Sequence, residues 1–477
     1  MSIPHRGRGS LLVVAWLIAC AACGQSNAVG PPAAPSDLTL DVGDGAVALG
    51  WQAPSNDGGA AIEGYQVTIA PAIPASDVHL SGTTALVSRL ANGTSYTFSV
   101  SARNRAGTGA ATSMAETPMA YSATAETPLQ IQGDASPSGI FDPSVILARS
   151  GTAWMAYSSV DYHLDAQNHQ VQDVGIALAR SDDGGDAWQY VRSVASPKPA
   201  LVTDTVAGHP VCGAATCDGR WVYETAWLVE DPTDVTGRRF KLFAHSYFLY
   251  PPAAAGGATV YVLGAIVLWT AATPDQLGAT PPVTALRWSL TPPELPGGID
   301  LNGLSPELAG CLAVAEGSTA VRGDVMDLVL ACIYPQAGAS PLPQKIVLLR
   351  SADHAQSFAY VATLLDTPDA SPLGADFYTA PSILPRADAA PVLLATPSFS
   401  GLYGGCAVIP FADLEAGALA RVAGLPAVIL FAPTGAGTFG GACAMDRALT
   451  GGILRNQVAL GSIWPPTFQI IRTERGL

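Results

Sequence analysis

The sequence predicts an all-β protein. Short runs that alternate apolar and polar residues recur along the 477-residue chain, and turn signals such as NDGG (56–59) and NG (92–93) separate them. Glycine (49 residues) and proline (38) are abundant, while charged residues make up 13% of the chain, which disfavours long exposed helices. The length predicts two or three domains. The formal net charge of −15 argues against a nucleic-acid partner and against an anionic membrane surface.

The first 23 residues have the pattern of an export signal. Arg6 and Arg8 precede the apolar run LLVVAWLIA (11–19), which is shorter than the ~20 residues that a membrane-spanning helix needs. LIAC (17–20) resembles the lipobox of bacterial lipoproteins, which implies a lipid on Cys20; AAC (21–23) offers Cys23 instead. Polar residues 24–36 would form a flexible tether. We expect a protein anchored by lipid to the bacterial cell envelope, with cleavage of an ordinary signal peptide and secretion as the alternative.

The remaining six cysteines indicate disulfides, because their number is even and the chain is predicted to be exported. CLAVAE (311–316) and DLVLAC (327–332) alternate like two strands of a hairpin around GSTAVRGD, which sets Cys311 opposite Cys332. Cys212–Cys217 would close a short loop, and Cys406–Cys443 takes the remaining pair. The CxxC spacing of a zinc site is absent among these six cysteines.

Residues 37–118 are predicted to form a β-sandwich. The runs AVALGWQA (46–53), GYQVTIA (64–70), TALVSRL (84–90) and SYTFSVSARN (95–104) alternate as strands do. With PPAAPSDLTL before them and LANGTSYTFSVSARNRAGTG (90–109) at the end, this stretch resembles a fibronectin type III domain. The resemblance implies that Trp51 is a core residue and that Tyr96 is the tyrosine corner. It implies a spacer or adhesive module without catalysis.

After a linker (119–132), residues 133–477 contain repeated units of four strands. SGIFDPSVILARSGTAWMAYSS (138–159) has an echo in FYTAPSILPRADAAPVLLATPS (377–398). Strand clusters at 138–194, 219–270, 284–365, 376–422 and 427–473 indicate a β-propeller of five blades. Six blades stay open, because 284–365 is long enough for more than one unit and the two ends of 133–477 can share a blade. The apolar run VYVLGAIVLW (260–269) is β-branched and short, so we expect a buried strand there.

Two related stretches, SDDGGDAW (181–188) and SADHAQSF (351–358), each follow the third strand of a unit. They resemble the Asp-box (BNR repeat) of the sialidase superfamily, commonly written S-x-D-x-G-x-T-W. The matching positions are Ser181, Asp183, Gly185, Trp188, Ser351, Asp353 and Phe358. In such a turn the Asp carboxylate accepts backbone N–H groups and Gly tolerates a positive φ. Asp183 and Asp353 are therefore predicted to be structural.

Candidate catalytic residues lie in the first strands of the first two units. Sialidases bind the sialate carboxylate with three arginines, but Asp142 stands where the first is needed, and Arg238, Arg239, Arg287 and Arg322 form no recognisable triad. FDPSV instead resembles the Asp-Pro that opens five-bladed furanosidases, which implies that Asp142 is a base or nucleophile; a local turn bond is the alternative. Ala380 at the corresponding place in the echo indicates that the strand does not need this Asp.

A second carboxyl is needed as general acid. Glu224 is the first candidate, because Trp221, Tyr223 and Trp227 around it could stack on a sugar ring; a surface strand residue is the alternative. Asp231, Asp204 and Asp376 are reserves. His163, His169, His209 and His245 have no metal-site spacing, and no dinucleotide or phosphate loop occurs in the sequence, so no cofactor and no metal are expected.

Two functions remain open at this point. The sequence favours a surface protein whose propeller binds glycan or protein ligands without catalysis, since the Asp-boxes are degraded and the arginines are missing. The alternative is a glycoside hydrolase that uses Asp142 and Glu224. In either case the expected partner is a carbohydrate or a cell-surface glycoconjugate, the membrane is contacted only through the lipid, and nucleic acid is excluded.

Overall fold

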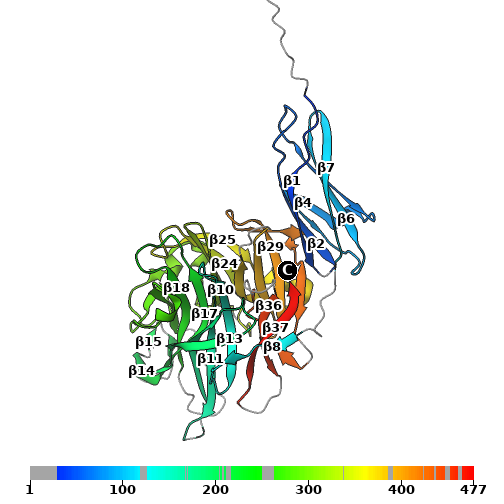
Figure 1. The fold of residues 1–477 in the computed structure, drawn as a ribbon. Helices are drawn as coiled ribbons and strands as arrows, with labels where there is room; N and C mark the ends of the chain where they lie inside the picture. The colour runs from blue at the N-terminus through cyan, green and yellow to red at the C-terminus, as the bar shows by residue number, and fades with distance from the viewer. Residues whose placement is uncertain are drawn as a thin grey trace, which may run out of the picture.

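The structure is a computed structural model that describes residues 29–43, 45–118, 126–166, 168, 170–203, 205–206, 209–210, 216–249, 263–336, 338–384, 390–422, 424–434, 437–445, 452–459 and 465–476. The predicted signal peptide with Cys20 and Cys23 lies outside these residues, as do Cys212, Asp204 and His169. Figure 1 shows an elongated N-terminal sandwich attached to a larger body of sheets. In the described part of the chain, no helix has the length and apolarity to cross a bilayer.

The N-terminal part is a two-layer β-sandwich, as predicted. One sheet has the order β1-β2-β5-β4 and the other β3-β6-β7. Trp51 is buried in the core between them, and the Tyr96 hydroxyl accepts the backbone N–H of Ala91 at 3.1 Å, which confirms the tyrosine corner. The strands are β1 Ser36–Gly43, β2 Ala46–Gln52, β3 Gly64–Ala70, β4 Val78–Ser81, β5 Thr84–Val87, β6 Tyr96–Asn104 and β7 Gly107–Glu116, with the short 3₁₀ helix η1 at Ala75–Asp77.

The rest of the chain forms five groups of antiparallel strands, called here the first to fifth sheets. The first is β10 Gly139–Leu147, β11 Ala153–Leu164, β12 Gln170–Ser181 and β13 Trp188–Ala195; the second is β14 Lys198–Thr203, β17 Thr216–Glu230, β18 Phe240–Leu249, β19 Gly264–Ala271 and β20 Val283–Arg287; the third is β22 Ala313–Arg322, β23 Val325–Ile333, β24 Gln344–Ser351 and β25 Ala359–Leu365; the fourth is β26 Phe377–Leu384, β27 Val392–Phe399, β29 Gly405–Asp413, β30 Ala418–Leu419 and β33 Leu430–Pro433; the fifth is β34 Thr438–Phe439, β35 Ala444–Met445, β36 Gly452–Ala459 and β37 Phe468–Gly476.

Shorter elements complete the body. They are the strands β8 Glu126–Pro128, β9 Ile131–Gln132, β15 Thr205–Val206, β16 His209–Pro210, β21 Ile299–Asp300, β28 Leu402–Tyr403, β31 Arg421–Val422 and β32 Leu425–Pro426, and the 3₁₀ helices η3 Pro274–Gln276, η4 Leu301–Gly303, η5 Pro306–Leu308 and η6 Thr367–Leu373.

The five sheets stand around a common axis. Their innermost strands, called here the first strands, are β10, β17, β22, β26 and β35, and the strands paired with them on the outer side, called the second strands, are β11, β18, β23, β27 and β36. β10 contacts β17, β17 contacts β22, β22 contacts β26, and β10 also contacts β35 and β36 from the end of the chain. Apolar cores lie between successive sheets, for example between the first and second and between the second and third. Sheets packed face to face around an axis are typical of a β-propeller.

Strands from both ends of the propeller part close the ring. β8, near the end of the predicted linker, pairs antiparallel with β37. The fully buried Arg455 on β36 donates two hydrogen bonds to the Glu126 carboxylate on β8, at 2.7 and 2.8 Å. The start and end of the propeller part therefore share one sheet, as the sequence had left open.

The hairpins at 181–188 and 351–358 have the same hydrogen-bond network. Ser181 Oγ donates to Asp183 Oδ1 at 2.6 Å, and Asp183 Oδ1 accepts the Ala187 N–H at 3.0 Å. Ser351, Asp353 and Ser357 repeat these contacts at 2.8 and 2.9 Å. Trp188 and Phe358 are buried beneath the turns. Ala355 keeps the positive φ of Gly185, at 68° against 101°, so the exchange of Gly for Ala leaves the turn intact.

Three expectations about the strands and aromatic side chains need correction. Residues 284–287 belong to β20, the outer strand of the second sheet, and the third sheet begins at Ala313, so 284–365 is not one unit. The strands of the 311–332 hairpin extend to Arg322 and Val325, with the turn at Gly323–Asp324. Trp221, Tyr223 and Trp227 are buried in cores between sheets, because neighbouring sheets cover both faces of β17. Trp227 also borders the cavity at the centre of the sheets.

The disulfides follow the predicted pairing where the structure describes both cysteines. Cys311–Cys332 and Cys406–Cys443 are bonded. Cys332 pairs in the ladder with Val314 rather than Cys311, so the bridge closes the strand end at an offset from the predicted register. Cys217 is also disulfide-bonded, and Cys212 lies outside the described residues.

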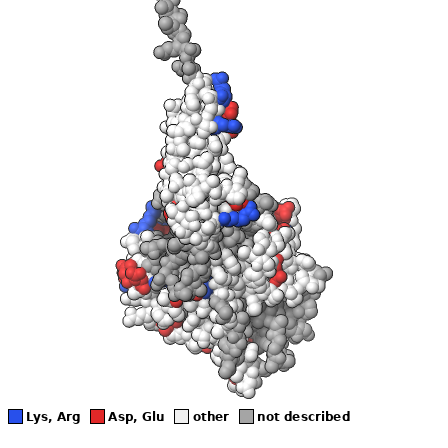
Figure 2. All heavy atoms as spheres, turned by 90° about the vertical axis from the view of Figure 1, so that its right-hand side faces the viewer, with Lys and Arg blue, Asp and Glu red and all other residues white. Residues whose placement is uncertain are grey.

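The sandwich rests on the fourth sheet. Ala48 and Leu86 share an apolar cluster with residues of β26, β27 and β29, and a cavity of about 280 Å³ lies beside this contact. On the side of the molecule that Figure 2 shows, charged side chains are few and scattered, as expected from a chain with 13% charged residues.

Candidate active site

The centre of the propeller part is built from β-bulges. In each of the first four sheets, the first strand shifts its pairing register with the second strand. The shifts lie between Phe141 and Ser144 in β10, Glu224 and Trp227 in β17, Val314 and Gly317 in β22, and Thr379 and Ser382 in β26. Asp142, Thr225, Ala380 and Ala442 have φ values of 52°, 52°, 45° and 48°, a left-handed conformation that is uncommon for residues other than glycine. Bulges re-aim side chains, and these occur where the first strands converge.

Side chains from the preceding sheet hold three of these strained residues. Ser158 Oγ accepts the Thr225 N–H at 3.1 Å, and Thr396 Oγ1 accepts the Ala442 N–H at 2.9 Å. Asn456 Oδ1 accepts the Asp142 N–H at 2.7 Å. Each contact crosses from the second strand of one sheet to a positive-φ residue of the next, so the ring of sheets is cross-linked at this level.

Three carboxyl groups meet at this level. Asp142 comes from β10, Glu224 from β17 and Glu316 from β22, so three successive sheets contribute one each. Asp142 is 5% exposed, and Asn456 Nδ2 and Ser158 Oγ donate to its oxygens at 2.6 and 3.1 Å. Glu224 and Glu316 are half-buried. Tyr247 donates to Glu224 at 2.6 Å, and Tyr403 and Thr379 donate to Glu316 at 3.0 and 3.3 Å.

Burial raises the pKa values of all three carboxyls, and the charge of Asp142 adds to the shifts of Glu224 and Glu316. Burial raises the pKa of Asp142 to about 6, against the hydrogen bonds from Asn456 and Ser158 that lower it. Burial, and then the charge of Asp142, raise the pKa of Glu224 to about 8. Burial followed by the charges of Asp142 and Glu224 raises the pKa of Glu316 well above its usual value. Asp142 therefore loses its proton first, and its two neighbours stay protonated to higher pH.

A cavity of about 240 Å³ runs along the axis from these carboxyls and is called here the axial cavity. Its wall comes from the first strands of the first four sheets and from residues 442–444 of the fifth. Asp142 and Glu316 belong to that wall, whereas Glu224, one residue before the bulge of β17, is not among its lining residues.

The sequence located two of the three carboxyls and missed Glu316. Asp142 and Glu224 were chosen as a pair, and the charge of Asp142 acts on both Glu224 and Glu316. Glu316 was visible in CLAVAE, but the unit containing it was not separated from residues 284–310. A correct division would have shown an acidic residue near the middle of the first strand of each of three successive units, in FDPSV, YETAW and AEGST.

The reserve acids have structural partners. Asp231 is buried and accepts a hydrogen bond from Lys241 Nζ at 2.9 Å. Asp376 is exposed and accepts the Ser400 N–H at 2.6 Å. Their contacts assign them to local structure instead of the axial cluster.

Asp231, Asp234 and His354 lie close enough to hold a metal ion. The buried Lys241 ammonium, however, donates to Asp231 and Asp234 at 2.9 and 2.8 Å, and to the Arg238 carbonyl at 2.9 Å. It holds the pKa of both carboxyls below the usual value, against the burial that raises it. The ammonium supplies the cation that these carboxylates need, so the cluster does not fit a metal ion.

The arginines that a sialidase would need are engaged elsewhere. Arg239 pairs with Glu230, Arg322 with Asp327 and Glu415, and Arg287 with Asp300. In the described residues, every side chain that hydrogen-bonds Asp142, Glu224 or Glu316 is neutral. His245, next to Glu224 in the β17–β18 ladder, is buried, and burial lowers its pKa to about 4.

Comparison with known proteins identifies the sandwich. Residues 33–117 match the model of the fibronectin type III domain. No curated protein matches the chain.

Solved structures similar to this chain are distant. A family 117 glycoside hydrolase of the marine bacterium Zobellia galactanivorans covers 74% of this chain and 91% of its own, at 12% identity and a TM-score of 0.40. The match to sucrose-6-phosphate hydrolase from Lactobacillus gasseri covers 70% of this chain and 59% of the hydrolase, at 12% identity and a TM-score of 0.38. The match to the NanB sialidase of Streptococcus pneumoniae covers 79% of this chain and 68% of the sialidase, at 10% identity and a TM-score of 0.34. Likenesses this distant do not decide what the chain does.

Proposed function

We propose that the protein is a glycoside hydrolase built on a five-bladed β-propeller, each of the five sheets being one blade. The observation that carries the proposal is the group of three carboxyls, Asp142, Glu224 and Glu316, held at the axis by neutral donors. Glycoside hydrolysis needs one ionised and one protonated carboxyl on either side of the scissile bond. Their pKa values are raised to different extents, which supports such a division of roles.

Asp142 is assigned as base or nucleophile and Glu316 as general acid. The carboxyl of Asp142 ionises at the lowest pH of the three. Burial, and then the charges of the other two carboxyls, raise the pKa of Glu316. The strand of Glu224, β17, lies between β10 and β22 in the ring, so Asp142 and Glu316 approach a bound sugar from different sides. Glu224 is a third carboxyl, and its proximity helps to raise the pKa of Glu316. The proposed chemistry uses only these carboxyls and water, and no cofactor is assigned.

The substrate class is a neutral glycoside of a surface or environmental glycan. Three acidic groups with neutral partners would repel a sialate or a uronate by like charge. The segments of the sequence that link β11 to β12, β18 to β19, β23 to β24, β27 to β29 and β36 to β37 also contain no Lys or Arg.

The activity should depend on pH in a defined direction. Asp142 must be ionised, so kcat/KM should rise as the pH rises through about 6. Glu316 must be protonated, so the rate should fall again in the alkaline range where this carboxyl finally loses its proton. Initial rates across pH 4–10 on one substrate measure both limbs, and a flat profile would contradict the assignment.

Hydrolysis of a panel of neutral aryl glycosides tests the function. The wild type should hydrolyse at least one of them, and Asp142→Asn should lower kcat/KM by roughly a thousandfold, within the range for loss of an acid or base group. Ala380→Gly is the matched control, because it changes the corresponding bulge without touching a carboxyl and its φ of 45° suits glycine. Equal rates for the wild type and Asp142→Asn would remove Asp142 from the mechanism.

Non-catalytic binding of a glycan or protein, the function that the sequence alone favoured, remains the second candidate. Its support is the missing arginine triad. A wild type that binds glycans on an array but hydrolyses none of the panel would favour it over the hydrolase.

We further propose that residues 181–188 and 351–358 are Asp-box repeats and that the chain is lipid-anchored through Cys20 or Cys23. The hydrogen bonds of Asp183 and Asp353 within their own turns support a structural role for both. A Cys20→Ala, Cys23→Ala double variant should leave the membrane fraction. Unchanged membrane association would refute the anchor.

A further inference from the structure

The axial cavity connects the carboxyl cluster with solvent on one face of the propeller part. Its wall begins at Asp142 and ends at Leu147 and Arg149, where Leu147 is 48% exposed. Asp142 and Leu147 are five positions apart along β10, which corresponds to ~17 Å at about 3.3 Å per residue. Leu147 pairs with Ala153, and Ala153 pairs with Ser181, so the open end lies on the face that carries the hairpin 181–188. This face is called here the hairpin face.

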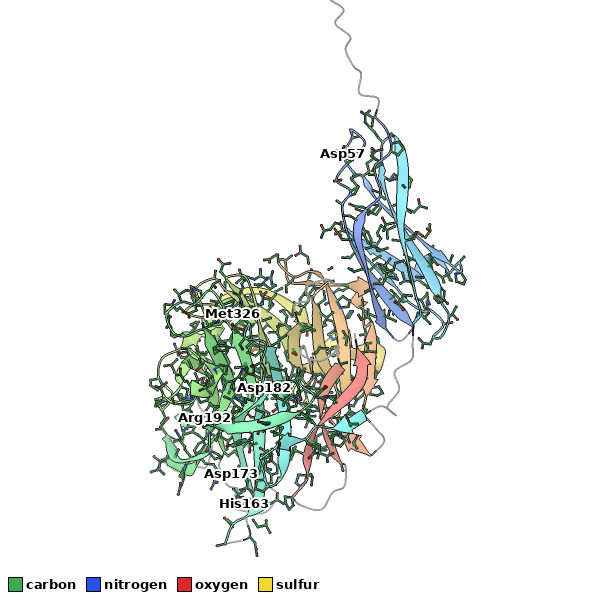
Figure 3. The ribbon with its side chains drawn as sticks, viewed as in Figure 1. Asp57, His163, Asp173, Asp182, Arg192 and Met326 are labelled. Atoms are coloured by element: carbon green, nitrogen blue, oxygen red, sulfur yellow. A yellow bond between two sulfur atoms is a disulfide. The ribbon has the colours of Figure 1, made fainter. Side chains whose placement is uncertain are left out.

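The second strands β11, β18, β23 and β27 end toward the opposite face. His163, near the β11–β12 turn, and Met326, at the start of β23, lie toward opposite ends of the propeller part in Figure 3. Tyr247, Tyr403 and Tyr162 belong to strand segments near this opposite face, and Tyr247 and Tyr403 donate to two of the carboxyls. Aromatic and hydroxyl groups of this kind suit a sugar.

The wall of the axial cavity offers hydroxyl groups to ordered water. Ser144, Ser318 and Ser382 line it beside aliphatic residues such as Val321 and Ile383.

Near the carboxyls the same cavity has hydroxyls without protein partners. Thr225 is 5% exposed and Thr319 is 8% exposed, and neither side-chain oxygen has a hydrogen-bond partner. Both residues belong to the cavity wall, beside Ser318 and Ser382. Buried hydroxyls that lack a protein partner are usually satisfied by ordered water, and a polar cavity of about 240 Å³ has room for several molecules.

We propose that the axial cavity holds a file of ordered water that supplies the hydrolytic water to Asp142 from the hairpin face, while the sugar binds from the opposite face. The inference rests on the proposed function. A sugar seated over the carboxyls displaces water from its own side, so each turnover needs water from elsewhere. The cavity reaches Asp142 and Glu316 from behind and ends at bulk solvent.

Filling the cavity tests this route. Ser382 lines it, and its hydroxyl contacts only Ser318 Oγ, at 3.4 Å, among the partners described for it. Ser382→Leu places an isobutyl group in the water file, and kcat on a neutral aryl glycoside should fall at least tenfold while KM stays within twofold. Ser382→Ala leaves the space open and should stay within twofold of the wild type in both constants. A Ser382→Leu enzyme with wild-type kcat, or with raised KM and unchanged kcat, would overturn the route, the second result because it places the sugar in the cavity.

A crystal structure of the wild type provides a readout that does not depend on turnover or on the folding of a variant. At high resolution, ordered water should bond the Thr225 and Thr319 hydroxyls and continue toward Leu147. A dry cavity, or a soaked monosaccharide inside it, would overturn the proposal. If the wild type hydrolyses no glycoside, the proposed function fails and catalytic use of the water fails with it, whereas the crystal structure still decides what fills the cavity.

Discussion

The bulges of the first and fourth sheets have the same backbone and different chemistry. Asp142-Pro143-Ser144 and Ala380-Pro381-Ser382 shift the pairing register in the same way, and their first residues have φ values of 52° and 45°. Ser158 and Thr396, which occupy the same ladder position before each bulge, both accept an N–H from the next sheet. Because alanine forms this bulge, the backbone does not require a carboxylate at Asp142.

The difference between Asp142 and Ala380 indicates that the acidic side chain serves something other than the bulge. A buried carboxyl with a raised pKa destabilises the folded state when it is ionised. A local turn bond, the alternative raised by the sequence, would instead have lowered the pKa. The comparison thus favours chemistry over structure for Asp142, and the following variants test it.

The largest effect is expected from exchanging the two residues. Asp142→Ala makes the first bulge a copy of the fourth, and kcat/KM should fall by a factor on the order of 10³, within the 10²–10⁴ that general acid–base groups contribute. The fold should persist, since Ala380 already adopts this backbone. Adding Ala380→Asp should not restore the rate, because the partners Ser158 and Asn456 stay at the first bulge. Steady-state kinetics with circular dichroism measure both, and rescue by the double variant would show the two bulges to be equivalent.

The next effect is on stability against pH. Asp142 has a folded-state pKa of about 6 against 3.8 when unfolded, so the wild type should lose stability as the pH rises from below 4 through 6. This shift in pKa lowers the free energy of unfolding by at most about 3 kcal/mol at high pH. Asp142→Asn removes this titration while keeping the side-chain shape. The difference in melting temperature, variant minus wild type, should therefore become more positive between pH 4 and pH 7.

Thermal melts of both proteins at pH 4, 5.5 and 7 give this difference directly. Ala380→Gly serves as control, because its difference from the wild type should not depend on pH. A wild type that gains stability relative to Asp142→Asn toward pH 7 would indicate a structural ion pair at Asp142.

The smallest effects are expected from removing the Ser158 and Thr396 hydroxyls, and they should differ between the two residues. Ser158→Ala and Thr396→Ala each remove one acceptor for a bulge N–H, at a cost of about 1–3 kcal/mol for a buried group left unpaired. Ser158 also donates to Asp142, so its loss should raise the pKa of that carboxyl further and move the acidic limb of the rate profile upward. Thr396→Ala should change stability alone. Denaturant unfolding and pH–rate profiles distinguish the two, and equal acidic limbs would argue against the bond from Ser158.

The sequence predicted the sandwich and the closing turns well because their signals are local. Trp51 and Tyr96 lie at fixed spacings, and Ser181, Asp183 and Trp188 make contacts within a single turn. The Cys311–Cys332 bridge was also predicted, although its register was not.

The centre could be predicted only in part, since it depends on which strands become innermost. Asp142 and Glu224 were found from local context, but the aromatic residues that drew attention to Glu224 proved to be core residues. Glu316 was missed because its half-buried environment comes from Tyr403 and Thr379, far along the chain. The axial cavity depends on five first strands meeting, which no local pattern encodes.

The most direct test of the three-carboxyl site compares leaving groups in Glu316→Gln. If Glu316 is the general acid, kcat/KM should fall by roughly a thousandfold for a glycoside with a poor leaving group and much less for a dinitrophenyl glycoside, whose departure needs no proton. Glu224→Gln should lower the rates on both glycosides by similar factors. Glu224 is not proposed to donate the proton to the leaving group; it affects the pKa values of the neighbouring carboxyls. Equal losses for both substrates in Glu316→Gln, or no loss, would contradict the assignment.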